Sequence, residues 1–253
     1  MVIELIISDD STARKKKLWT LVRALAGTEI GAVSDKEYEK VVGEIHELCY
    51  EHSIHLQANE LYAEFPYKSL VKKLVEDHVE MEHCRRRDDF DRYCLALYQQ
   101  LENMVCYTVD HYNLWEEAKN KKHDPINAGF QVKDLFLYSK KGKVAENERK
   151  KNSDYFDREA GDLKMKDKFK LFLYFIYFNG KAGSKGIFDR VFYQMWGVYL
   201  VRNRTHRTAV KEQYTIDQLN QIDLVHAQKY LQYGGFLADC IERVHVHFNH
   251  WNR

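Results

Sequence analysis

Arg202 and His206 are the residues of this sequence whose types and spacing best suit chemistry on phosphate. They lie four positions apart, and on a helix that spacing places both side chains on one face, about one turn apart. An arginine guanidinium is always charged and binds phosphate through two parallel hydrogen bonds. A histidine imidazole titrates near neutral pH and can therefore accept or donate a proton. Together the two side chains suit metal-free cleavage of RNA.

In such a reaction the 2′-hydroxyl attacks the adjacent phosphate, His206 moves a proton, and Arg202 stabilises the negative charge on the phosphorane. Asn203 faces a different direction from Arg202, so it can orient the histidine or bind the backbone of a neighbouring helix. Arg204 and Arg207 add positive charge for binding the phosphate chain. On spacing alone, a solvated charged face with no catalytic role explains the cluster equally well.

The segment around this cluster, residues 198–206, resembles the signature helix of the HEPN superfamily. In that family a hydrophobic helix ends in Arg-Asn, a histidine follows a few residues later, and another long helix comes after a loop. Residues 215–251 are the candidate for that later helix. Residues 97–102 are similar to an early helix of such bundles, which often contains a Leu-Glu pair. The resemblance covers about residues 84–251, and its specific part is the short motif.

The resemblance implies a bundle of four or five helices that dimerises, with two copies of the motif forming one composite ribonuclease site. It gives catalytic roles to Arg202 and His206, with Asn203 as the supporting polar residue. The implied activity is that of a cofactor-free, metal-independent endoribonuclease in a toxin or antiviral defence system. RNA, a second copy of the chain and a partner protein of such a system are the expected partners.

The spacing within the motif departs from the family pattern. Three residues separate Arg202 from His206, whereas the family usually has four to six. One residue is about 100° of helix rotation, so the departure alters how the two side chains face each other. A second function therefore stays open, namely a non-catalytic helical module that binds nucleic acid, a nucleotide or a partner protein as an accessory subunit.

Helical periodicity accounts for most of the chain that must position this cluster. Only 2 prolines occur among 253 residues, which favours long helices. Apolar stripes at helical spacing predict several helices, at residues 12–26, 34–49, 54–83 with a break near Pro66, 84–119, 187–208 and 215–251. The last of these is either one helix bent at Gly234-Gly235 or a helix pair. The aromatic run at residues 166–179 suits a buried helix or a strand, and periodicity does not decide between them.

These elements predict an all-α, HEPN-like helical bundle with an additional N-terminal helical region. We place the N-terminal region at residues 1–83 and the bundle at residues 84–253. Within the bundle, glycines and charge runs at about residues 120–165 predict a long charged insertion with at most short helices.

Three other segments contain residues that could bind a ligand. The loop at residues 180–186 lacks the spacing of a phosphate-binding loop, but Lys181 and Lys185 could contact nucleic acid. Two histidine-rich stretches could hold a metal, although their spacing drifts around a helix and ordinary polar helix surfaces explain them better. They comprise His46, Cys49, His52 and His55, and near the C-terminus His245, His247 and His250.

Composition limits the cellular setting. The formal charge of +1 means that nucleic-acid binding would have to come from a local patch. The 5 cysteines form no CxxC pair, which indicates free thiols in a reducing compartment. The longest apolar stretch is far below the roughly 20 residues that span a bilayer, so we expect a cytoplasmic protein without a membrane partner.

Overall fold

The structure is a computed structural model that describes residues 20, 35–127, 130–136, 156–181, 184–206 and 213–251. The chain divides into two compact units, residues 1–60 and residues 61–253. Nearly all of α3 (Asp35–Tyr62) belongs to the first unit and extends the helix expected from residue 34 onward. Apart from Thr20, the helix expected at residues 12–26 lies outside the described residues.

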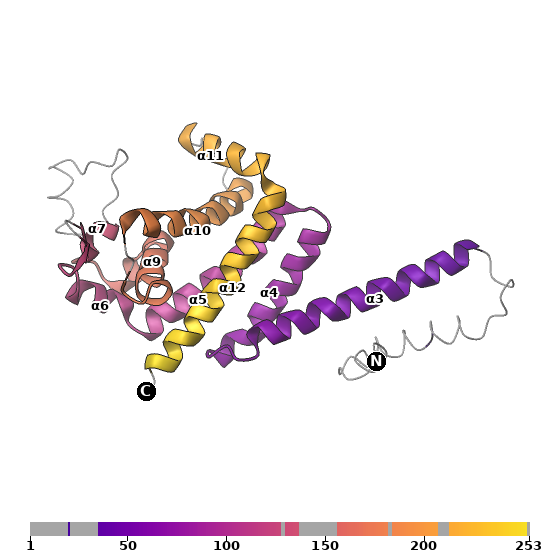
Figure 1. The fold of residues 1–253 in the computed structure, drawn as a ribbon, viewed down its shortest axis with the longest axis horizontal. Helices are drawn as coiled ribbons and strands as arrows, with labels where there is room; N and C mark the ends of the chain where they lie inside the picture. The colour runs from indigo at the N-terminus through magenta and orange to yellow at the C-terminus, as the bar shows by residue number, and fades with distance from the viewer. Residues whose placement is uncertain are drawn as a thin grey trace. The chain divides into compact units, whose positions relative to one another are not determined.

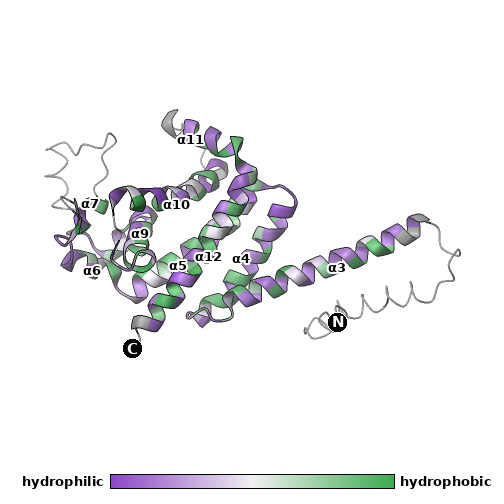
Figure 2. Cartoon of the chain, viewed as in Figure 1, coloured by the Kyte–Doolittle hydropathy of each residue, from purple (hydrophilic) through white to green (hydrophobic). Residues whose placement is uncertain are grey.

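The second unit is built around α5 (Phe90–His111). The helices that pack against it include α4 (Lys68–Arg86), α9 (Met165–Phe172), α10 (Lys185–His206) and α12 (His226–Trp251) (Figure 1). The buried face of α5 includes every member of the apolar stripe expected there, namely Phe90, Tyr93, Cys94, Leu97, Leu101, Met104 and Val105. The predicted all-α bundle is confirmed. Figure 2 shows hydrophobic and hydrophilic bands alternating along α12, as in other amphipathic helices.

The prediction of one helix over residues 84–119 is wrong at two points. Asp88 and Asn113 adopt left-handed conformations, with φ of 55° and 50°. Such residues end a helix, and Asp and Asn tolerate this conformation because their short side chains hydrogen-bond locally. The side chain of Asp89 then caps α5 by accepting a hydrogen bond from the backbone N–H of Arg92 at 3.2 Å. After Asn113, α6 (Leu114–Asn120) starts in a new direction.

The aromatic run at residues 166–179 is a buried helix and not a strand. It comprises α9 and one π-helical stretch, η3 (Leu173–Tyr177). Asn179 and Gly180 end it with φ of 49° and 70°, and the backbone N–H of Gly180 donates to the carbonyl of Tyr174 at 2.8 Å. Because η3 packs against α12, its aromatic rings lie in the core. Because most of this segment is buried, polar residues do not mark a single exposed helix face in its sequence.

The C-terminal region is a helix pair, as one of the two alternatives predicted. It consists of α11 (Gln213–Leu224) and α12, with a break at Val225. The helix α12 continues through Gly234 and Gly235, so the two glycines do not interrupt it. A Cβ atom at position 234 would lie 3.3 Å from the Tyr93 hydroxyl, so the small residue there serves close packing against α5.

The boundary between the two units lies earlier than predicted. The sequence suggests a division between residues 83 and 84, but that point falls inside α4, whose residues Leu74 and Met81 are buried in the core of the second unit. A helix with an apolar stripe gains stability only by packing that stripe, and α5 provides the surface for it. The residues from Leu61 onward therefore form one compact unit that includes α4.

Only parts of the predicted insertion at about residues 120–165 are described. They form an antiparallel pair of short strands, β1 (Pro125–Asn127) and β2 (Phe130–Gln131), and then α7 (Val132–Phe136). A turn of 3₁₀ helix, η2 (Ala160–Asp162), precedes α9. Residues 128–129 and 137–155 of the insertion lie outside the described residues.

Candidate functional site

Arg202 lies near the C-terminal end of α10 and is half-buried. Its guanidinium carbon lies 5.1 Å from the centroid of the Tyr98 ring on α5, within range of a cation–π contact. Its Nη1 donates a hydrogen bond to Oδ1 of Asn203 at 2.9 Å. The two contacts fix the direction of the guanidinium, and they show that Asn203 orients the arginine, a role that the sequence did not predict.

The Tyr98 ring, which contacts the Arg202 guanidinium, is itself held by several neighbouring residues. The Tyr98 hydroxyl donates to Oε1 of Glu102 at 3.1 Å, and the Tyr98 ring contacts that of Tyr199 at 5.8 Å. Burial raises the pKa of Tyr98, and the neighbouring Glu102 raises it further, so the ring stays neutral. Tyr199 stacks in turn on Trp196 at 4.6 Å. Aromatic residues of α5 and α10 therefore form the platform for Arg202.

The backbone of α10 remains helical through His206, so the four-residue separation from Arg202 corresponds to about one turn of a continuous helix. The position of the His206 side chain, like all of Arg207, lies outside the described residues. Asn203 is only 9% exposed. The catalytic roles of Arg202, Asn203 and His206 stay predictions.

Arg204 bridges three helices. Its Nη2 forms an ion pair with Asp91 of α5, and its Nη1 forms another with Asp223 of α11 at 2.6 Å. Two carboxylates thus offset the positive charge that the sequence assigns to phosphate binding. In the structure Arg204 joins α10 to α5 and α11, and a role in binding RNA stays a prediction.

Arg204→Met is expected to lower the free energy of unfolding by about 1–2 kcal/mol, because the partly buried Asp91 and the more exposed Asp223 lose their shared partner. Urea denaturation followed by circular dichroism measures the change. Arg190→Met on the same helix is the matched control, since the Arg190 side chain is exposed and has no carboxylate partner within the described ranges. Equal stability of both variants would contradict a structural role for Arg204.

Lys181 and Lys185 lie far from Arg202. Lys181 is exposed in the loop before α10, and Lys185 in the first turn of α10 pairs with Asp189 at 2.8 Å. A helix rises about 1.5 Å per residue, so Lys185 and Arg202 are separated by roughly 26 Å along the axis. The structure does not bring these lysines together with the motif, and contact with nucleic acid would require a ligand several nucleotides long.

The C-terminal histidine-rich stretch has ordinary polar contacts. His245 Nδ1 lies 3.1 Å from the carbonyl oxygen of Glu64, and its Nε2 is 3.0 Å from Nδ2 of Asn249. The ring of His247 lies edge-on to Tyr112 at 5.1 Å. In the part of the chain that the structure describes, no three His, Cys, Asp or Glu side chains are arranged to hold a metal ion.

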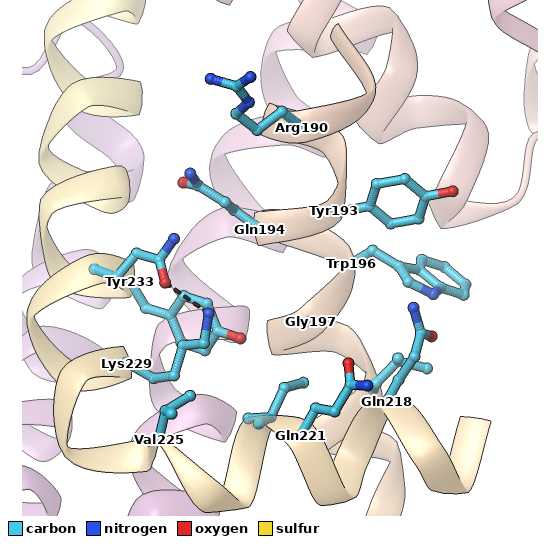
Figure 3. Close-up of a pocket in the computed structure, with 13 residues that line it drawn as sticks. Arg190, Tyr193, Gln194, Trp196, Gly197, Gln218, Gln221, Val225, Lys229 and Tyr233 are labelled. Carbon is cyan, nitrogen blue, oxygen red and sulfur yellow. Dashed lines mark hydrogen bonds between the residues drawn. The ribbon is translucent and has the colours of Figure 1, made fainter. Parts of the chain in front are cut away.

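A cavity that the sequence analysis missed lies between α10, α11 and α12 (Figure 3). Its volume is about 460 Å³. The polar residues that line it include Arg190, Gln194, Gln218, Gln221, Lys229 and Gln232. The one sequence signal is the pair Gln218 and Gln221, which share a helix face. The cavity itself depends on how three helices meet, which local periodicity does not reveal.

By its fold and its candidate site, the protein is an all-α protein with an arginine cluster at the end of a core helix. Searches against protein-family models, curated proteins and solved structures found no match for this chain. Among the helices that are described, none is long and apolar enough to cross a membrane.

Proposed function

We propose that this protein is a metal-independent endoribonuclease of the HEPN type, with Arg202 and His206 as its catalytic residues. One observation supports this most directly. Tyr98 and Asn203 hold the Arg202 guanidinium in place, about one helical turn before His206 on the same continuous helix. A donor that is already fixed stabilises a developing charge effectively, because it need not reorganise when the charge appears.

In the proposed reaction the 2′-oxygen of a ribose forms a bond to the adjacent phosphorus, and the bond from phosphorus to the 5′-oxygen breaks. His206 accepts the proton of the 2′-hydroxyl, and Arg202 stabilises the charge on the phosphorane. A second His206, from the other copy in a homodimer, protonates the leaving oxygen. The products are a 2′,3′-cyclic phosphate and a 5′-hydroxyl. The expected setting is a cytoplasmic toxin or antiviral system.

The second candidate function is a module that binds nucleic acid, a nucleotide or a partner protein without cutting. The ion pairs of Arg204 with Asp91 and Asp223 favour it, because a basic residue of the motif is used to join helices. The short spacing between Arg202 and His206 favours it as well. This alternative predicts that RNA binding depends on Arg202 while cleavage never occurs.

Cleavage of end-labelled RNA in EDTA tests the proposal. We expect the wild type to cut RNA and to leave DNA of the same sequence intact, because DNA lacks the 2′-hydroxyl. His206→Ala and Arg202→Ala should each slow cleavage by about 10²-fold or more. His46→Ala, which removes an imidazole that is 71% exposed in the first unit, should leave the rate unchanged.

Two results would decide against the enzyme. If the wild type binds RNA without cutting it and Arg202→Ala weakens binding, the non-catalytic module is supported instead. If the wild type neither binds nor cuts any RNA tested, the ribonuclease and a module that binds RNA are both rejected, and a module that binds a nucleotide or a partner protein is left. Cleavage that disappears in EDTA would reject the metal-free mechanism.

A further inference from the structure

The cavity between α10, α11 and α12 has the size of a small-molecule site. Its volume of about 460 Å³ falls within the range of about 300–1,000 Å³ that is usual for ligand pockets. Figure 3 shows side chains from the three helices around Gly197. All of these residues belong to the second unit, and neither Arg202 nor His206 lines the cavity.

The charge of the cavity is positive. Of the described residues that line it, Arg190 and Lys229 are cationic and none is acidic. Lys229 Nζ donates to Oε1 of Gln232 at 2.7 Å and lies 5.5 Å from the Tyr233 ring centroid, so its ammonium group is held at the cavity wall. Within the described ranges neither cation has a carboxylate partner. Both charges are therefore available to an anion.

Two aspartates close to the cavity along α10 and α11 are paired with other cations. Asp189 pairs with Lys185 at 2.8 Å, and Asp223 pairs with Arg204 at 2.6 Å. A phosphate entering the cavity would thus meet Arg190 or Lys229 without competition from either of these carboxylates. Arginine and lysine are the side chains that proteins most often use to bind phosphate.

The remaining lining groups suit a flat, hydrogen-bonding ring. Four glutamines line the cavity, and each amide offers both donors and an acceptor, as base edges require: Gln194, Gln218, Gln221 and Gln232. Tyr193 is 40% exposed and can offer ring surface to a base, whereas Trp196 already stacks on Tyr199 at 4.6 Å and lies 5.1 Å from the Lys166 ammonium. Amides, aromatic rings and cations together match a nucleotide better than a simple anion.

Gly197 makes room for this cavity. A Cβ atom at position 197 would lie 2.5 Å from the Tyr233 hydroxyl oxygen and 3.6 Å from Cδ1 of Ile222. Tyr233 is only 2% exposed, so its ring has little space to move away. Any larger residue at 197 would push Tyr233 or intrude on the pocket. Glycine at this position therefore sets how closely α10 approaches α12.

We propose that this cavity binds one nucleotide unit, with the base against the glutamines and with Arg190 or Lys229 available to the phosphate. The unit is either a free nucleoside monophosphate or one nucleotide of an RNA chain, since both present the same groups. The site goes beyond the proposed ribonuclease activity, because neither Arg202 nor His206 lines the cavity.

Calorimetric titration at low salt tests the proposal. The ligands are the four ribonucleoside 5′-monophosphates, inorganic phosphate and a short oligoribonucleotide. We expect at least one monophosphate, or the oligoribonucleotide, to bind more tightly than inorganic phosphate. Lys229→Met or Arg190→Met, whichever removes the cation that binds the phosphate, should weaken that binding by about tenfold. Lys72→Met is the matched control, because it removes one exposed lysine of α4, and it should change affinity less than about twofold.

Two more variants test whether a loss of binding comes from the cavity and not from misfolding. A third substitution separates binding from RNA cleavage. Gln221→Glu places a negative charge at an exposed lining position, so it should weaken binding without disturbing the core. Gly197→Ala should reduce binding through loss of space, and circular dichroism checks that it still folds. All titrations are repeated in the His206→Ala background, where binding should persist even though RNA cleavage is expected to be lost.

The results of these titrations distinguish a free nucleotide from a nucleotide of an RNA chain, and they show whether the cavity binds a nucleotide at all. Binding of a monophosphate that the pocket variants weaken supports a free nucleotide, and binding restricted to the oligoribonucleotide supports an RNA nucleotide. Equal affinity for inorganic phosphate would overturn the proposal, because the base would contribute nothing. Binding that the pocket variants leave unchanged, or no binding of any ligand, would also overturn it.

Discussion

Trp115→Ala is expected to lower the free energy of unfolding by about 3–5 kcal/mol, the usual range for removing a buried tryptophan. Trp115 lies on α6 and is 1% exposed. Its ring stacks on Phe156 at 5.3 Å with an interplanar angle of 8°, and it meets Phe136 of α7 edge-on at 5.9 Å. Its Nε1–H donates to the carbonyl of Arg158 at 2.9 Å. One side chain thus joins three segments around the charged insertion.

Urea denaturation followed by circular dichroism measures this effect as a shift of the midpoint. Trp115→Phe keeps most of the ring contact but removes the hydrogen bond to Arg158, so its cost should be smaller. Leu231→Ala on α12 is the control for a large apolar residue that is 78% exposed, and it should change stability by less than about 0.5 kcal/mol. A midpoint for Trp115→Ala equal to that of the control would contradict the role of this residue.

Lys170→Met is expected to raise the free energy of unfolding at pH 7 by about 1–3 kcal/mol. Lys170 is 4% exposed, and its ammonium lies 6.0 Å from the Phe136 ring centroid and 5.8 Å from that of Phe192. Burial and, to a smaller extent, the charge of Lys166 lower its pKa to about 8, while Asp167 opposes the shift. Because its pKa stays lowered, the groups around Lys170 offset only part of the cost of burying the charge. Methionine fills a similar volume without that cost.

The pH dependence of this gain has a definite sign. Below pH 8 both the folded and the unfolded chain protonate Lys170, so the folded state bears the full cost of the buried charge. Between pH 8 and the ordinary lysine pKa of 10.5, the unfolded chain binds more protons, and the wild type gains stability as pH rises. The advantage of Lys170→Met should therefore be largest below pH 8 and shrink toward pH 10.5.

The measurement compares each variant with the wild type at the same pH, which removes the effect of other titrating groups. This matters because burial raises the pKa of Cys84 to about 11, and that thiol affects stability in the opposite direction. Lys72→Met, an exposed substitution on α4, should show no pH-dependent difference. A constant advantage of Lys170→Met from pH 7 to pH 10.5 would show that its charge is not the cause.

Much of the helical architecture follows from the sequence alone. The apolar stripe from Phe90 to Val105 predicted the buried face of α5, and the scarcity of proline agreed with long helices. The break near Pro66 also appears, between α3 and α4. These features depend on the helical period and on local backbone preferences, which a single sequence displays directly. The breaks at Asp88 and Asn113 were missed, because left-handed residues interrupt a helix without disturbing the apolar pattern.

The candidate site could be only partly predicted, because its decisive contacts join distant parts of the chain. The sequence placed Arg202, Asn203 and Arg204 on one helix. Only the tertiary structure showed that Arg204 meets Asp91, 113 residues away, and that Arg202 lies on the ring of Tyr98. The cavity around Gly197 likewise exists because α10, α11 and α12 converge there. Helical periodicity determines which face of a helix is apolar, whereas the packing of one helix on another determines which polar side chains meet.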